Sequence, residues 1–276
     1  MKKTNYYLID SGGQRKLEQF GPYLIDRPCS QALWQASSSK LWKSADLRLE
    51  RAEKSQWQGK IPKAWQIQHK GLFFELEPTD FGHLGIFPEH FLHWDWIEER
   101  IDPQKEQIAL NLFAYTGALS VYMASRGLRV CHVDASKPVI EWSKKNQRIN
   151  GLEKAPIRYI LDDALKFVKR ELRRGNTYDL IALDPPSFGR GPKGEVFKIE
   201  DQVFDLLSSC QELLSKNASG LLFTCHSPGF SPLQAKNLFE QIFKNRKGQI
   251  QAAELALPSL NACGLPSGIY ARWQPC

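Results

Sequence analysis

The sequence contains no apolar run of the about 20 residues that a helix needs to cross a bilayer. Its first residues, MKKTNYYLIDSGG, lack the apolar stretch and the small-residue cleavage site of a secretory signal. The six cysteines are scattered, with no Cys-x-x-Cys pair and no cysteine and histidine cluster at metal-ligand spacing. The sequence therefore predicts a cytoplasmic protein with free thiols, no membrane contact and no metal site.

The charge balance favours a polyanionic partner. Lys and Arg number 37 against 30 Asp and Glu, which gives a net charge of +7 and a pI near 9.0. Each lysine or arginine that contacts a phosphate releases counterions, so a basic protein gains affinity for nucleic acid. The excess is mild, and many basic proteins bind no nucleic acid, so charge alone leaves the partner open.

From about Ile108 onward, short apolar runs alternate with helical periods, a pattern typical of the βα units that build a parallel sheet. One helix is expected over 162–174, because leucine and valine recur at helical spacing from Leu161 while the rest of its surface is basic. The predicted fold class is α/β, with a Rossmann-like, mostly parallel sheet. Its seven predicted strands are 108–113, 128–134, 157–161, 178–184, 220–225, 250–257 and 269–273.

The first hundred residues differ in character. Short strand-like pieces such as YYLID and GLFFELEP alternate with turn residues, and five of the eight tryptophans lie at or before Trp94. This pattern predicts a smaller, β-rich N-terminal domain over 1–100 and a larger domain over 101–276. A helix that begins at Pro88 is expected to join the two.

Acidic side chains follow the predicted strands at the points where the strands end. They are Asp134 after the second strand, Asp162 and Asp163 after the third, and Asp184 after the fourth. In open parallel sheets, ligands bind outside the carboxyl ends of the strands, where the strand order reverses. An acid placed like Asp134, seventeen positions after Gly117, can accept both hydroxyls of a ribose. These acids predict a ligand site at one edge of the sheet.

The turn after the first predicted strand has too few glycines for a dinucleotide. NLFAYTG, residues 111–117, contains only Gly117, whereas the fingerprint Gly-x-Gly-x-x-Gly brings three glycines close to a pyrophosphate. This shortage weighs against a nicotinamide-dependent dehydrogenase. A ligand with ribose and adenine but no phosphate tolerates such a turn, and the positive sulfonium of S-adenosylmethionine also suits acidic strand ends.

Four segments carry a family resemblance: NLFAYTGALS from Asn111, the acid at Asp134, DDA at 162–164 and DPPSF at 184–188. Together they resemble the class I S-adenosylmethionine-dependent methyltransferases, and most closely bacterial 23S rRNA methyltransferases of the cytosine-C5 and guanine-N2 type. The resemblance extends over about residues 70–230 and implies a seven-stranded methyltransferase sheet with S-adenosylmethionine as its cofactor.

The resemblance also implies a cofactor site at the ends of four strands. The turn after the first strand would line the methionine end of the cofactor, Asp134 would hold the ribose, and Asp163 would receive the adenine amino group. The implied cofactor-binding residues are Phe113, Ala114, Tyr115, Gly117, Asp134, Ala135, Asp162, Asp163, Ala164, Asp184 and Pro185.

Asp184 is expected to face the target base and to be catalytic. A carboxylate on a Pro-Pro turn has little freedom, because proline fixes φ. It is therefore preorganised to accept a hydrogen bond from an exocyclic amine or a protonated ring nitrogen. Amine-methylating relatives usually carry a stacking aromatic where this sequence has Ser187, so the target atom stays open. The glycine-rich, basic segment 189–198 is either a flap that closes over the cofactor and grips phosphates or an ordinary solvated loop.

Cys225 is the second candidate catalytic residue. Methylation at cytosine C5 needs a thiolate that adds to C6, and TCHS at 224–227 resembles the segment that carries this cysteine in the rRNA C5 enzymes. The alternative is a small apolar side chain in a buried strand, which is the commoner fate of a cysteine. His226 beside it either lowers the pKa of the thiol or hydrogen-bonds a neighbour.

The sequence thus predicts an S-adenosylmethionine-dependent methyltransferase that modifies a base in RNA, with ribosomal RNA favoured. Two alternatives stay open: a methyltransferase that acts on protein or DNA, and a non-catalytic RNA-binding or assembly protein that retains the fold. The oligomeric state is not indicated by the sequence.

Overall fold

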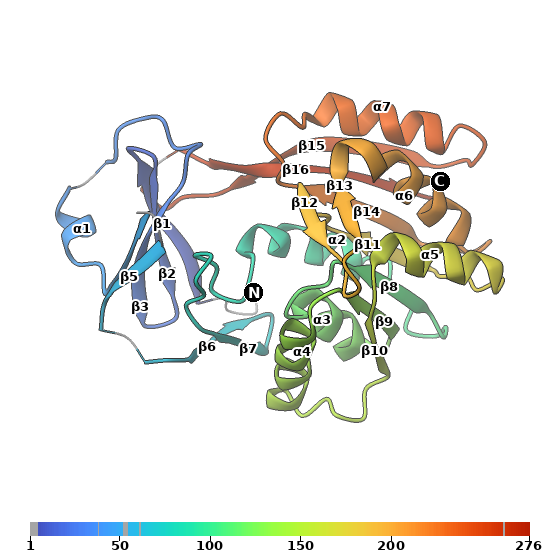
Figure 1. Cartoon of the computed structure of the whole chain (residues 1–276), viewed down its shortest axis with the longest axis horizontal. Helices are drawn as coiled ribbons and strands as arrows, with labels where there is room; N and C mark the ends of the chain where they lie inside the picture. Colours follow the sequence, from blue (N-terminus) through green and yellow to red (C-terminus); the bar gives the residue numbers. More distant parts are fainter. Residues whose placement is uncertain (1–4, 38, 52–54, 61, 262) are drawn as a thin grey trace. The chain divides into compact units, whose positions relative to one another are not determined.

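The computed structural model describes residues 5–37, 39–51, 55–60, 62–261 and 263–276. The chain divides into two compact units, each of which takes residues from two parts of the sequence (Figure 1). The first unit comprises Met1–Phe91 with Ala256–Ser267, and the second comprises Leu92–Leu255 with Gly268–Cys276.

The first unit contains a five-stranded sheet in the order β1-β2-β3-β4-β5. β3 and β4 pair in parallel, and the other neighbours are antiparallel. A short helix, α1 (Ser39–Lys43), precedes β4, and β6 (Trp65–His69) pairs with β7 (Leu72–Leu76) in a separate hairpin. The predicted β-rich character is confirmed. The five strands are β1 (Tyr6–Gly12), β2 (Arg15–Phe20), β3 (Tyr23–Pro28), β4 (Leu47–Arg51) and β5 (Ser55–Gly59).

A buried ion pair lies within this first sheet. The Glu18 carboxylate accepts hydrogen bonds from Nε and Nη2 of Arg27 at 2.8 and 2.6 Å, and Lys16 lies 3.2 Å away. Burial raises the pKa of Glu18, but the two cations outweigh that effect and hold the pKa below its ordinary value. Removing one partner would leave an uncompensated charge in the core, so the pair fixes how β2 and β3 pack.

The second unit contains a seven-stranded sheet in the order β10-β9-β8-β11-β14-β16-β15. The first five of these strands pair in parallel, and β16 runs antiparallel to β14. Every strand predicted from Ile108 onward is present, which confirms the predicted fold class. The strands are β8 (Ile108–Leu112), β9 (Arg129–Asp134), β10 (Ile157–Leu161), β11 (Leu180–Leu183), β14 (Gly220–Cys225), β15 (Gln249–Leu257) and β16 (Leu265–Gln274).

Helices cover both faces of this sheet, as βα crossovers require. α3 (Ala118–Ser125) and α4 (Lys137–Ile149) pack on one face, and α5 (Ala164–Arg173), α6 (Ile199–Leu213) and α7 (Pro232–Ile242) pack on the other. The larger hydrophobic core lies under α5, α6 and α7, where inward side chains of β8, β9, β11 and β14 alternate with those of the opposite face. The sheet is therefore buried on both sides, and its edges remain for binding.

Two predicted segments differ from expectation. The helix expected from Pro88 begins as a 3-10 helix, η1 (Pro88–His93), and continues as the short helix α2 (Trp94–Glu98). The segment expected as a glycine-rich loop instead forms a hairpin of β12 (Phe188–Arg190) and β13 (Val196–Lys198). Among the described residues, no helix has both the length and the apolar character needed to cross a bilayer.

Substitution of Phe239 in α7 tests how the larger hydrophobic core is packed. Its ring is fully buried and contacts Phe223 and Phe243, with ring centroids 6.3 and 5.5 Å away. Phe239→Ala should lower the free energy of unfolding by about 3–5 kcal/mol, because it leaves a cavity in a packed core. Leu233→Ala on the same helix is the control, since that side chain is 65% exposed. Equal losses in urea denaturation of the two variants would contradict the described orientation of α7.

Candidate active site

The candidate site residues follow adjacent strands of the second sheet. Leu112 at the end of β8 is the register partner of Leu183 at the end of β11, so the turn after Leu112 and Asp184 begin side by side. On the other side of β8, β9 ends at Asp134 and β10 ends just before Asp162. The chain order reverses between β8 and β11, which is where open parallel sheets bind ligands.

The turn after β8 has an unusual backbone. Phe113 and Tyr115 have φ angles of 54° and 50°, and Gly117 has a φ of 76°. Left-handed backbone at a non-glycine residue costs about 1–3 kcal/mol, so two such residues only two positions apart need support from their surroundings. Ala114, between them, is buried and donates its N–H to the carbonyl of Val133 at 3.1 Å. The strained turn is thus held against β9.

Gly117 is the N-cap residue of α3, and no side chain fits at its position. A Cβ built on Gly117 would lie 1.8 Å from Oγ of Ser143 and 3.3 Å from Cε1 of His132. Under it, Ser120 Oγ accepts a hydrogen bond from the amide of Asn111 at 2.9 Å and shares one of 3.0 Å with Nδ1 of His132. The buried hydrogen bonds among Asn111, Ser120 and His132, and the close contact of Gly117 with Ser143, hold the turn, α3 and α4 near one another.

The Asp134 carboxylate joins two turns. Oδ2 accepts the N–H of Tyr115 and Oδ1 accepts the N–H of Ser136, both at 2.9 Å. Burial raises the pKa of Asp134, while the backbone N–H groups of Ser136, Tyr115 and Ala135 oppose that rise. A carboxylate has about four lone-pair positions, so these contacts leave acceptor capacity for the two hydroxyls of a ribose. The residue fits the role that the sequence predicts.

The two acids after β10 differ in their surroundings. Asp162 Oδ2 pairs with Arg170 at 2.5 Å, and its Oδ1 accepts the N–H of Asp163 at 2.9 Å. Asp163 caps α5, because its Oδ1 accepts the N–H of Lys166 at 2.9 Å, and Ala164 is the first residue of that helix. Each Asp162 oxygen therefore has one contact within the chain, whereas Asp163 Oδ2 has no hydrogen bond among the described residues and can accept one from a ligand.

Asp184 carries a half-buried carboxylate held by the neighbouring strand. Thr224 of β14 donates a hydrogen bond from Oγ1 to Asp184 Oδ1 at 2.7 Å, and Nε2 of His226 lies 3.4 Å from the same oxygen. The Asp184 side chain is 23% exposed, and Pro185 after it is buried. The sequence reasoning did not assign Thr224 or the contact with His226, although both lie in the segment TCHS that it singled out.

Cys225 is buried next to this group, near enough for the charge of Asp184 to act on its thiol. Successive strand residues face opposite sides of a sheet, and Thr224 faces Asp184. Cys225 is 1% exposed and belongs to the core under α6 and α7. Burial raises the pKa of its thiol. The nucleophile assignment stays a prediction, and these observations favour its alternative, a small core residue.

The hairpin β12–β13 is fastened to α5 by a contact that the sequence did not reveal. Lys166 Nζ lies 2.7 Å from Oε1 of Glu195, and Glu195 Oε2 accepts the N–H of Lys193 at 2.8 Å. Lys166 and these backbone contacts hold the pKa of Glu195 down at about 2. Phe197 of β13 packs on Phe113 of the strained turn, with ring centroids 5.2 Å apart. The hairpin therefore covers one side of the candidate site.

The buried histidine beneath the turn predicts a pH effect on stability. Burial lowers the pKa of His132 to about 3, whereas an unfolded histidine takes up a proton near about 6.5. The unfolded state therefore binds more protons between these values, and stability falls as pH falls through that window. From pH 7.5 to 5.5, urea denaturation should show the wild type losing about 1 kcal/mol more than His132→Gln. His83→Gln, at an exposed histidine, should lose as much as the wild type; a His132→Gln profile like theirs would contradict the described burial.

Comparisons with known proteins agree with this geometry. The model of the S-adenosylmethionine-dependent methyltransferase family matches residues 21–240. A solved methyltransferase of Agrobacterium tumefaciens, described as dependent on S-adenosylmethionine, is 38% identical, with a TM-score of 0.95 over 99% of this chain and 91% of that chain.

Two curated relatives are ribosomal RNA large subunit methyltransferases K/L. The protein of Pseudoalteromonas atlantica is 31% identical over 173 residues, and that of Hahella chejuensis is 33% identical over 162 residues. These matches cover 62% and 58% of this chain but 22% of each relative, so the chain spans about a fifth of their length. The matched family, the shared fold and the acidic strand ends lead to one conclusion: the chain belongs to the S-adenosylmethionine-dependent methyltransferases.

Proposed function

We propose that this chain transfers a methyl group from S-adenosylmethionine to a base in ribosomal RNA. The observation that carries the proposal is the Asp184 carboxylate, partly exposed at the point where the strand order reverses and fixed by Thr224 at 2.7 Å. The names of the two curated relatives and the net charge of +7 support RNA as the substrate over protein or DNA. Such a substrate is consistent with the cytoplasmic location expected from the sequence.

In this proposal the cofactor lies along the ends of β8, β9 and β10. The turn from Phe113 to Gly117, with Ala114 and Tyr115, lines its methionine end. Asp134 and the adjacent Ala135 hold the ribose through the carboxylate positions that Tyr115 and Ser136 leave unused. Asp163, with Asp162 and Ala164 beside it, receives the adenine amino group through Oδ2, since Oδ1 caps α5. When bound, S-adenosylmethionine supplies an electrophilic methyl group, and its transfer leaves a neutral thioether.

Asp184 orients the base and accepts its proton. Its Oδ1 is held by Thr224, so Oδ2 lies in a fixed position, and Pro185 limits the backbone beneath it. An exocyclic amine that donates to this carboxylate would be held in one orientation, and in-line transfer needs its lone pair aligned with the methyl group. The methylated nitrogen then loses one proton, and the carboxylate lies within reach of it.

Asp184→Asn tests this role directly. The amide keeps the shape and the contact with Thr224 but cannot take a proton, so methyl transfer should fall by about 10²–10³-fold. Transfer of tritiated methyl groups to ribosomal RNA from cells lacking this protein measures the activity. Calorimetry with S-adenosylhomocysteine separates binding from transfer, because the ribose and adenine contacts assigned to Asp134 and Asp163 are unchanged in this variant. Asp201→Asn, at an exposed acid of α6, is the control.

Two results would contradict the proposal. Undiminished transfer by Asp184→Asn would remove Asp184 from the reaction. Absence of methyl transfer to any ribosomal RNA by the wild type, with S-adenosylhomocysteine still bound, would reject the substrate while leaving the methyltransferase family in place.

The role of Cys225 can be separated from that of Asp184. Because the thiol is buried on the other face of β14, Cys225→Ala should keep transfer within about tenfold of the wild type. Cys210→Ala, at a fully buried cysteine of α6, controls for the loss of core volume. Loss of transfer in Cys225→Ala alone, together with covalent trapping of RNA that contains 5-fluorocytosine, would instead establish Cys225 as the nucleophile.

A further inference from the structure

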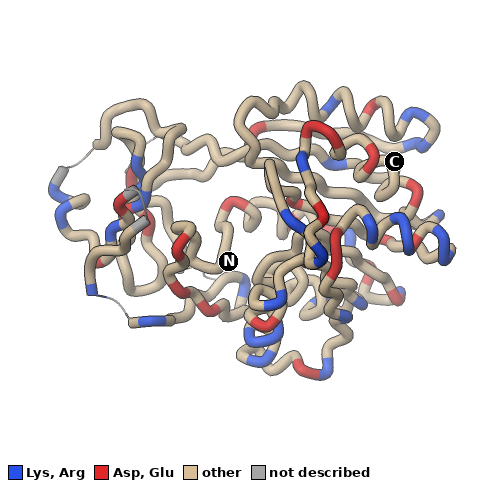
Figure 2. The backbone as a smooth tube through the Cα atoms, in the orientation of Figure 1, with Lys and Arg blue, Asp and Glu red and all other residues tan. Residues whose placement is uncertain are grey.

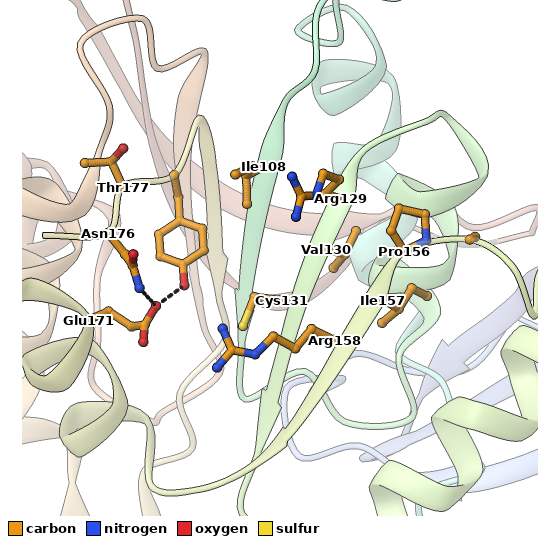
Figure 3. A pocket seen from close by; sticks show the side chains of 12 residues that line it. Ile108, Arg129, Val130, Cys131, Pro156, Ile157, Arg158, Glu171, Asn176 and Thr177 are labelled. Atoms are coloured by element: carbon orange, nitrogen blue, oxygen red, sulfur yellow. Dashed lines mark hydrogen bonds between the residues drawn. The ribbon is translucent and has the colours of Figure 1, made fainter. Parts of the chain in front are cut away.

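A second hollow lies at the opposite edge of the seven-stranded sheet. It has a volume of about 430 Å³ and is formed where β8, β9 and β10 begin, next to the end of α5 (Figure 3). β9 separates it from the acidic edge by about 16 Å, because Arg129 begins that strand and Asp134 ends it. The two edges are thus distinct places on one sheet. The hollow is lined by Ile108, Arg129, Val130, Cys131, Ala155, Pro156, Ile157, Arg158, Glu171, Asn176, Thr177 and Tyr178.

Two arginines face the same side of the sheet in this hollow. Arg129 is the register partner of Ile108, and Arg158 is the register partner of Cys131, so side chains of three adjacent strands lie on one face. Cys131 packs in the core that α5 covers, and its pKa is raised to about 11 by burial. Arg129 and Arg158 lie toward the beginning of their strands, at the margin of that core. Figure 3 shows Arg129 and Arg158 across the hollow from Glu171 and Asn176.

The carboxylate in the hollow already has its partners. Glu171 Oε2 accepts hydrogen bonds from Asn176 at 2.7 Å and from Tyr178 at 2.8 Å, and its Oε1 pairs with Arg174 at 3.1 Å. Burial raises the pKa of Glu171, but the hydrogen bonds from these three residues and the charge of Arg158 lower it below its ordinary value. Glu171 is therefore ionised at neutral pH, and Asn176, Tyr178 and Arg174 already stabilise its charge.

The two arginines make no such direct contact, although Arg158 is near enough to Glu171 to lower its pKa. Arg129 and Arg158 are both exposed, and neither makes a hydrogen bond or an ion pair with a residue that the structure describes. Arginine presents a planar fork of donors that matches phosphate oxygens. The guanidinium groups of Arg129 and Arg158 lie at one hollow, opposite the Glu171 carboxylate, whose charge its own hydrogen-bond partners already balance. This arrangement favours a ligand that carries a phosphate.

The rest of the hollow suits a flat ring. Ile108, Pro156 and Tyr178 provide an apolar wall. The Asn176 side-chain oxygen has no hydrogen bond among the described residues, because only the amide nitrogen contacts Glu171. That oxygen can accept a hydrogen bond from the amino group of a base. A volume of about 430 Å³ lies within the range of ligand pockets, which is about 300–1,000 Å³.

We propose that this hollow binds a nucleoside phosphate, with the phosphate on Arg129 and Arg158 and the base between the apolar wall and Asn176. The site is separate from the methyl-transfer site and does not depend on the proposed substrate. The same chemistry is present in a free nucleotide and in an unpaired nucleotide of an RNA chain. Lys and Arg also occur along α5, which runs from the acidic edge to this hollow, and two of them, Lys166 and Arg170, pair with Glu195 and Asp162 (Figure 2).

Binding is measured on the full chain with the cofactor site filled. Calorimetry with AMP, GMP, CMP and UMP in saturating S-adenosylhomocysteine keeps nucleotides out of the adenosine site. At least one nucleotide should bind, and Arg158→Gln and Arg129→Gln should each weaken it about tenfold, because each removes a charge-assisted contact. Arg148→Gln, at an exposed arginine of α4, removes the same charge elsewhere and should leave the affinity unchanged. Affinity for S-adenosylhomocysteine should be unchanged in all three variants.

A second experiment distinguishes a free nucleotide from a nucleotide of an RNA chain as the ligand. A single-stranded RNA oligonucleotide is titrated into the same variants at the same salt concentration. If Arg158→Gln weakens binding of the RNA and of the nucleotide alike, the ligand is a nucleotide of RNA. If it weakens only the nucleotide, the ligand is a free nucleotide. Equal weakening by Arg148→Gln would show a non-specific charge effect and overturn the site, as would the absence of any nucleotide or RNA binding that depends on Arg129 and Arg158.

Discussion

The two hydrogen bonds of the Asp134 carboxylate are the interaction on which the candidate site depends. They join the turn after β8, through Tyr115, to the start of α4, through Ser136. Together with the bond from the Ala114 N–H to Val133, they support the left-handed backbone at Phe113 and Tyr115, which is disfavoured by about 1–3 kcal/mol at each residue. A single acid thus shapes the turn, and in the proposed function the same carboxylate also holds the ribose.

The strands and their acidic ends could be predicted because each follows from local pattern. Apolar runs of four to seven residues, separated by helical periods, leave few arrangements other than a parallel sheet, and the carboxyl ends of parallel strands meet at one edge. The family motif then assigned the acids. The difference between Asp162 and Asp163 could not be predicted, because it depends on which oxygen pairs with Arg170 and which caps α5.

Features that depend on contacts between residues far apart in the chain could not be predicted from the sequence. The hairpin at 188–198 was expected as a loop, and the salt bridge from Lys166 to Glu195 joins residues 29 positions apart. The buried group of Asn111, Ser120 and His132 was also missed, because each residue by itself is ordinary in a strand or helix. The place of Ala256–Ser267 in the first unit is likewise set by tertiary contacts, such as the hydrogen bond from Leu260 to Leu8.

The alternation of β14 bears on which atom of a base is methylated. Thr224 and Cys225 are neighbours in sequence, yet one hydrogen-bonds Asp184 and the other lies in the core beneath α6 and α7. A C5 mechanism needs the thiol and the carboxylate to reach the same pyrimidine ring, from C6 and N3 respectively. The Cys225 thiol is 1% exposed, so it can reach a base only if the residues that cover it move. Amine methylation needs only the carboxylate that Thr224 already fixes, so it requires no such movement.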